Sequence, residues 1–102
     1  MRKATPYIHS MIKSFQHKGL EAFFRSGSKA GIQAHHSDRL KTMLFALDSA
    51  TKAVDMNAPG WRLHALTGKR KGYWSVSVSG NWRLIFRFTG SDAELIDYLD
   101  YH

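Results

Sequence analysis

The sequence predicts an α+β fold in which N-terminal helices pack on one face of a mainly antiparallel sheet. Apolar residues recur at helical spacing in the first half of the chain, and from Trp74 onward they alternate with polar residues at a period of two. Pro59 and Gly60 separate the two patterns, because both residues interrupt helices. A chain of 102 residues has the length of one domain and leaves no room for a second.

Ahead of the break we expect a short strand and a short helix. Residues 11–15 have the pattern of a strand that can add an edge to the sheet. Residues 18–25 carry Leu20, Phe23 and Phe24 at helical spacing, and Gly27 then provides a stop.

The longest helix is expected to begin at Ser37 and Asp38, because these residue types cap helices. One face then stays apolar as far as Asp55. The residues of this face are Leu40, Met43, Leu44, Leu47, Ala50 and Val54.

Beyond the break we expect a three-stranded antiparallel meander. Residues 74–78 and 82–88 alternate apolar with polar residues around a turn at residues 79–81, which predicts a hairpin with one apolar face. A second turn at residues 90–92 leads to a last strand from Ala93 to about Tyr101. Trp61, Trp74 and Trp82 are mainly core candidates.

Composition narrows the class of protein. The chain has no cysteine, which excludes disulfides and thiolate ligands. No run approaches the ~18 apolar residues that a membrane span needs, and the first residues lack the apolar core of a secretory signal. We therefore expect a soluble, cytoplasmic protein that makes no membrane contact. Residues 1–10 are expected to be an extension without function, ahead of a domain that spans residues 11–102.

The net charge of +7 is large for this surface and attracts polyanions. No acidic residue occurs between Met56 and Ser91, and four of the eight acids then follow between Asp92 and Asp100. This separation of signs predicts a basic face that binds RNA. The cations of this face are Arg62, Lys69, Arg70, Lys71, Arg83 and Arg87.

A few residues have the chemistry that RNA cleavage needs. If the aromatic residues of the hairpin face the helices, Arg83 points to the opposite face and is able to meet a phosphate. His64 precedes the basic run of residues 69–71, and Asp100 and His102 share one side of the last strand. Histidine changes charge near neutral pH and can therefore act as base or acid, while a cation stabilises the phosphate.

Other histidines have structural explanations. His35 and His36 approach a helix cap, and no acid or cysteine completes a metal site beside them. His9 and His17 suggest no function. We expect no metal and no other cofactor.

Several motifs occur in a fixed order along the chain, and the last of them ends at His102. The motifs are Lys13-Ser14-Phe15, Arg62-Leu63-His64-Ala65-Leu66-Thr67-Gly68, Gly72-Tyr73-Trp74-Ser75, Asn81-Trp82-Arg83 and Asp100-Tyr101-His102. Through these motifs the chain from Met11 onward resembles the HigB toxins within the RelE and ParE superfamily. The resemblance implies a RelE-like fold and a ribosome-dependent endoribonuclease that cleaves mRNA in the A site of the 30S subunit.

The resemblance also implies roles for individual residues. Arg83 would contact the scissile phosphate, Asp100 and His102 would transfer protons, His64 would transfer a proton or orient the substrate, and Tyr101 would position it. Many relatives have lysine where this chain has Thr67, so a phosphate contact there would come from the neighbouring basic run. The implied partner is a HigA-type helix-turn-helix antitoxin. The toxin would contact operator DNA only through this antitoxin.

Two other functions compete with this interpretation. A ParE-like poison of DNA gyrase would share the fold and act by binding a protein, without residues for proton transfer. A basic RNA-binding module without activity would need the cations but not His64, Asp100 or His102.

Overall fold

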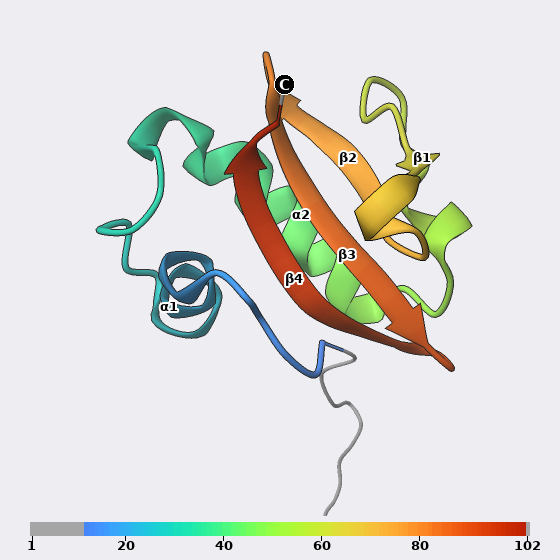
Figure 1. The fold of residues 1–102 in the computed structure, drawn as a ribbon. Coiled ribbons are helices and arrows are strands. Elements are labelled where there is room, and N and C mark those ends of the chain that lie inside the picture. The colour runs from blue at the N-terminus through green and yellow to red at the C-terminus, as the bar shows by residue number, and fades with distance from the viewer. Residues whose placement is uncertain (1–11, 102) are drawn as a thin grey trace, which may run out of the picture.

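A computed structural model defines residues 12–101 and shows helices packed against a four-stranded antiparallel sheet (Figure 1). The strands lie side by side in the order β1-β2-β3-β4, and α2 covers the rear face in the view of Figure 1. The predicted α+β fold is confirmed. In chain order, the elements are α1 (Lys18–Ser26), the 3-10 helix η1 (Ala34–His36), α2 (Ser37–Ser49), η2 (Ala53–Met56), β1 (His64–Ala65), η3 (Gly68–Arg70), β2 (Trp74–Ser79), β3 (Trp82–Thr89) and β4 (Asp92–Asp100).

Helix α1 begins and ends close to the predicted bounds. Leu20 and Phe23 are buried on its inner face. Gly27 ends the helix with φ 83°, a left-handed conformation that costs glycine little because it has no Cβ atom. At the other end His17 is the N-cap, and its Nδ1 accepts the backbone N–H of Leu20 at 2.9 Å. His17 therefore has a structural role that its sequence position did not suggest.

Helix α2 begins at Ser37, and the prediction that Ser37 and Asp38 cap it is wrong. The 3-10 helix η1 runs directly into α2, so the N-cap residue is His36, whose side chain makes no capping hydrogen bond. The apolar face is as predicted over the helix itself. Its buried side chains are Leu40, Met43, Leu44 and Leu47.

The same helix ends at Ser49, so the prediction that it extends to Asp55 is also wrong. The Asp55 carboxylate accepts hydrogen bonds from the backbone N–H and the hydroxyl of Thr51, at 3.0 and 3.4 Å. Such local bonds compete with helical ones and lower the helix preference of these residues. The chain turns into η2 instead, which leaves Val54 58% exposed and buries Met56.

The segment ahead of α1 follows the edge of β4 without becoming a regular strand. Ile12 and Phe15 form isolated parallel bridges to Ala93 and Ile96. The predicted strand is therefore wrong in form, although its place at the sheet edge is right. Its first predicted residue, Met11, lies outside the defined part of the chain. The fourth strand of the sheet is β1, a two-residue strand that the sequence pattern did not predict.

The hairpin of β2 and β3 confirms the predicted antiparallel pair, with Trp74 opposite Phe86 and Val76 opposite Leu84. Its second face is less exposed than predicted, because Ser75 and Ile85 on that face are also buried. The segment that carries η3 lies in front of this part of the sheet in Figure 1.

Strand β4 contains an irregularity that its sequence pattern did not predict. The register with β3 shifts between Ile85 and Arg87, and Leu95 has φ 55°. A bulge of this kind lets two residues on one strand oppose one residue on its neighbour. Ala93 and Ile96, three residues apart, are consequently both buried.

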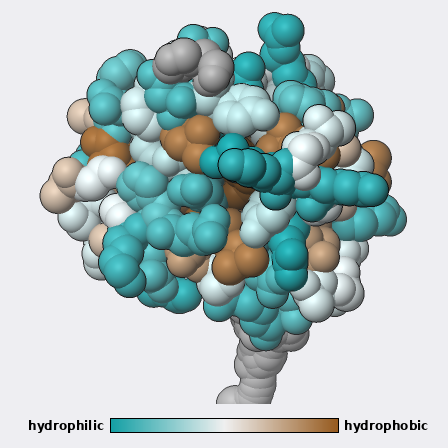
Figure 2. Space-filling model, viewed as in Figure 1, coloured by the Kyte–Doolittle hydropathy of each residue, from teal (hydrophilic) through white to brown (hydrophobic). Residues whose placement is uncertain are grey.

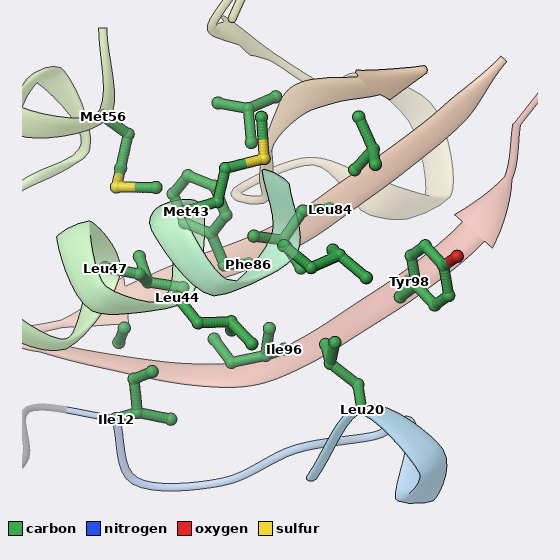
Figure 3. Close-up of a cluster of buried hydrophobic side chains, with 14 of the residues drawn as sticks. Ile12, Leu20, Met43, Leu44, Leu47, Met56, Leu84, Phe86, Ile96 and Tyr98 are labelled. Carbon is green, nitrogen blue, oxygen red and sulfur yellow. The ribbon is translucent and has the colours of Figure 1, made fainter. Parts of the chain in front are cut away.

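The core lies between α1, α2 and the rear face of the sheet (Figure 3). Trp61, Trp74 and Trp82 are partly buried against it, as predicted. None of the helices between residues 12 and 101 has the length and apolar composition needed to cross a membrane.

Candidate active site

The sheet face opposite α2 presents two of the predicted catalytic side chains. His64 lies across from Ser75 in the register of β1 and β2, and Ser77 lies across from Arg83 in that of β2 and β3. Since Ser75 and Ser77 are two residues apart, their partners share one face. His64 and Arg83 are separated by two strand spacings, about 10 Å across the sheet. Hydrophilic residues cover most of the surface on this side (Figure 2).

Arg83 is half-buried, and its guanidinium is held against the hairpin turn. Its Nη1 donates to the Gly80 carbonyl at 2.9 Å, to the Ser77 hydroxyl at 3.2 Å and to the Trp82 carbonyl at 3.4 Å. All its hydrogen bonds to the defined residues use Nη1, so Nε and Nη2 keep donors for an oxyanion. An arginine held in this way can bind a phosphate with little loss of side-chain freedom.

Tyr101 is tied to the same turn from the C-terminal end of the sheet. Its backbone N–H donates to the Asn81 carbonyl at 2.8 Å, and the Arg70 guanidinium lies 5.7 Å from the centre of its ring. The second contact has cation-π geometry and links the basic run to the chain end. Lys69 and Arg70 of this run lie in η3. Arg70, Tyr101 and Arg83 therefore surround one region of the surface.

His64 is exposed on β1, and its ring is oriented through Nδ1. This atom lies 3.3 Å from the Arg62 carbonyl oxygen and 3.5 Å from the hydroxyl of the buried Ser75. A carbonyl oxygen can only accept, so Nδ1 carries the proton of the neutral ring when this bond forms. Nε2 then carries a lone pair and can take up a proton. Arg62 has φ 56°, an uncommon backbone conformation beside the site.

Asp100 does not share this face. It lies across from Trp82 in the register of β3 and β4, whereas Arg83 lies across from Leu99. Asp100 therefore leaves the sheet on the side of the helices, at the same end of the sheet as Arg83, and its side chain is exposed. His102, which was predicted on the same side of the last strand as Asp100, lies outside the residues that the structure defines.

The predicted RNA-binding cations differ in how they are engaged. Arg62, Lys69, Arg70 and Lys71 are exposed. Arg87 instead pairs with Glu94 at 2.7 Å and stacks on Tyr73. The hydrogen bond to Glu94 raises the pKa of Arg87, and the Thr89 hydroxyl and Arg87 together lower the pKa of Glu94. Because its charge is already compensated, Arg87 is the weakest RNA-binding candidate of the set.

Three residues that support the site were not identified from the sequence. Ser75 and Ser77 contact His64 and Arg83, and the Asn81 carbonyl anchors Tyr101. Serines on a polar strand face give no signal of this kind, because the contacts depend on strand register. Within the defined residues, no cluster of three or more His, Asp or Glu side chains could hold a metal ion.

Comparisons with known proteins show which family the chain resembles. A family model described as the RelE-like toxin of the type II toxin-antitoxin system HigB matches residues 13–102. The chain is 46% identical to "Endoribonuclease HigB" of Proteus vulgaris over 92 residues, which cover 90% of this chain and 100% of that protein. It is 34% identical to "Toxin HigB-1" of Vibrio cholerae serotype O1 over 94 residues, 90% of this chain and 98% of that one.

Proposed function

This chain belongs to the RelE-like HigB toxins of type II toxin-antitoxin systems, and we propose that it is an endoribonuclease that cleaves mRNA in the ribosomal A site and so inhibits translation. The observation that carries the proposal is the convergence of Arg83 and Tyr101 on one turn, with His64 on the same face of the sheet. A relative that aligns over its whole length is named an endoribonuclease, which supports the same activity.

The proposed reaction is a transfer of the phosphate within the RNA strand. The 2′-oxygen attacks the neighbouring phosphorus, the O2′–P bond forms, and the P–O5′ bond breaks. A base must take the 2′-hydroxyl proton, and an acid must give a proton to the leaving 5′-oxygen. The pentacoordinate phosphorus needs a cation beside it. The reaction consumes no water in this step and needs no metal ion.

Each of these tasks has a candidate residue. Arg83 binds the scissile phosphate through Nε and Nη2, and His64 acts through Nε2 as the base or orients the substrate. Asp100 and His102 transfer a proton at the leaving oxygen, and Tyr101 positions the nucleotide. Asp100 lies on the opposite face of the sheet from Arg83. The RNA must therefore wrap around the end of β4 to contact Asp100.

Dependence on the ribosome follows from what the site lacks. The strands that carry His64 and Arg83 lie two spacings apart, so the RNA must be held in a particular geometry between the two side chains. A codon held in the A site would be positioned for in-line attack, and positioning accounts for a large part of catalysis. Arg62 and the basic run of residues 69–71 would hold the enzyme against phosphates of ribosomal RNA.

The family also implies an antitoxin as partner. We propose that this antitoxin is of the HigA type, with a helix-turn-helix that binds operator DNA, and that the toxin contacts DNA only through it. A substrate on the ribosome places the activity in the cytoplasm.

A comparison of two targets in growing cells tests the proposed function. After brief expression, cellular mRNA is probed for new 5′ ends and a reporter plasmid for loss of negative supercoils. New ends inside codons with unchanged supercoiling support the endoribonuclease. Intact mRNA with relaxed plasmid would favour gyrase poisoning, and no effect on either target would favour passive RNA binding.

A further inference from the structure

A buried hydrogen bond lies at the end of the core that supports the candidate active site. His36 is 3% exposed and Tyr98 is 2% exposed, and the Nδ1 atom of His36 lies 2.7 Å from the Tyr98 hydroxyl oxygen. Figure 3 shows Tyr98 at one end of the apolar cluster, on β4 close to the arrowhead of the strand. The pair joins the start of α2 to the C-terminal end of β4.

A third group contacts the Tyr98 hydroxyl. The Gln33 backbone N–H donates to the Tyr98 oxygen at 3.3 Å, so the hydroxyl already accepts one hydrogen bond. The hydroxyl keeps its own proton, which it donates to Nδ1 when the neutral His36 ring is protonated at Nε2. Burial, with the adjacent His35 as a second cause, lowers the pKa of His36 and favours the neutral ring. His36 is therefore held as a neutral hydrogen-bond partner of Tyr98.

The same pair contacts β3 and β4, the strands that carry Arg83 and Asp100. The ring of Trp82 lies 4.7 Å from that of Tyr98 and 5.6 Å from that of His36, between ring centres. Trp82 directly precedes Arg83 on β3 and lies across from Asp100 on β4. Tyr98 is two residues ahead of Asp100 on the same face of β4. A shift of either ring would therefore move Arg83 relative to the C-terminal residues.

We propose that His36 is a positioning residue of the nuclease: through its hydrogen bond to Tyr98 and its contact with Trp82, it fixes the end of β4 against the start of β3. The proposal rests on the proposed function for its effect on cleavage, but its effect on the chain end does not depend on that function. Three other titratable residues contact the pair within the part of the chain that the structure defines. The His35 ring lies 4.4 Å from that of His36 between ring centres, His17 packs edge-on against Tyr98, and the Asp97 carboxylate accepts the backbone N–H of Tyr98.

The test compares the loss of one hydroxyl at each end of β4. Tyr98→Phe removes the hydrogen bond to His36 and keeps the ring. Ser14→Ala is the matched control, because the Ser14 hydroxyl accepts the backbone N–H of Leu95 at 2.9 Å, far from the candidate site. We expect Tyr98→Phe to lower kcat on programmed ribosomes about tenfold with little change in KM, since a small displacement of catalytic groups is costly. Ser14→Ala should leave kcat within about twofold of wild type.

Substitution of His36 provides a rescue experiment. His36→Asn places a side-chain acceptor near the position of Nδ1, whereas His36→Leu places none there. We expect the asparagine variant to recover most of the kcat that the leucine variant loses. Equal losses in both variants, or equal losses in Tyr98→Phe and Ser14→Ala, would overturn the positioning role and leave only a contribution to stability.

Amide hydrogen exchange reads out the same coupling without catalysis. The Tyr101 N–H is bonded to Asn81 at one end of β4, and the Lys13 N–H is bonded to Ala93, at 2.8 Å, at the other end. Tyr98→Phe should accelerate exchange at Tyr101 severalfold and leave Lys13 unchanged. Uniform acceleration at both amides, or none at Tyr101, contradicts the proposal. If the wild type cleaves no mRNA, the proposed function fails, and the exchange result still decides whether His36 and Tyr98 order the chain end.

Discussion

The Arg83 side chain and the Tyr101 backbone bind neighbouring carbonyl oxygens of one hairpin turn, those of Gly80 and Asn81. Residues 18 positions apart in the chain are thereby brought to one end of the sheet. The turn holds both residues without using its own side chains, because both acceptors are backbone carbonyl oxygens. The candidate site is therefore built on the geometry of the β2–β3 hairpin.

Arg83 should be required for cleavage and dispensable for folding. Arg83→Ala should reduce the rate on programmed ribosomes by about 10² to 10³, because the phosphate loses its cation in the transition state. The unfolding free energy should change by no more than about 1 kcal/mol, since the side chain is only half-buried. Arg25→Ala on α1 is the control. A rate for Arg83→Ala equal to that of the control would remove Arg83 from the mechanism.

His64 should contribute to the chemical step through Nε2. His64→Ala should lower the single-turnover cleavage rate by about 10² to 10⁴, the usual range for loss of a general acid or base. Ribosome affinity should be unaffected, because Arg62 and the basic run of residues 69–71 are the proposed docking groups. Thr42→Ala on the other side of the molecule serves as the control. Loss of affinity together with an unchanged rate at saturation would assign His64 to binding only.

Acid should destabilise the protein through His36. Its pKa is lowered in the folded state, so below the unfolded value of about 6.5 the unfolded chain binds the proton more readily. The stabilising contribution is therefore complete above about pH 6.5 and is lost as the pH falls toward the lower folded-state pKa. Urea unfolding at about pH 7.5 and about pH 5.5, on either side of that value, should show a larger loss for wild type than for His36→Asn. The same loss in both proteins would exclude His36 as the source.

Association with ribosomes should weaken steeply as salt rises, because binding to phosphate releases counterions. The double variant Lys69→Ala and Lys71→Ala should bind more weakly and reduce the slope of log affinity against log salt by roughly one for each phosphate that it no longer neutralises. Lys29→Ala with Lys41→Ala removes the same charge from exposed positions on the helical side. Equal slopes for the two double variants would show that the basic run does not form the docking surface.

Much of the fold was predictable because its signals are periodic and local. Leu20 and Phe23 mark α1, Gly27 marks its end, and the alternation from Trp74 to Phe88 marks the hairpin. The end of α2 was not predictable, since the Thr51 to Asp55 hydrogen bonds compete with a helix that the apolar pattern favours. Strand β1 has two residues, too few to show any period, and exists through its pairing with β2.

The site was predictable in its residue types and only partly in its arrangement. Alternation placed Arg83 on the face opposite the helices, and the structure agrees. Asp100 lies on the opposite face from Arg83, because it pairs with Trp82 in the register of β3 and β4. This position agrees with the alternation predicted for the last strand. The roles of His17 and His36 could not be predicted, because they depend on contacts with Leu20 and Tyr98 that only the folded chain creates.

The central claim is that this surface cleaves mRNA on the ribosome, and mapping of mRNA 5′ ends by primer extension in a purified translation system tests it most directly. Wild type, Arg83→Ala and a deletion of His102 are compared with and without ribosomes. The account predicts cuts within codons for wild type in the presence of ribosomes, and intact mRNA in every other lane. Cleavage that persists without ribosomes, or in both variants, would contradict it.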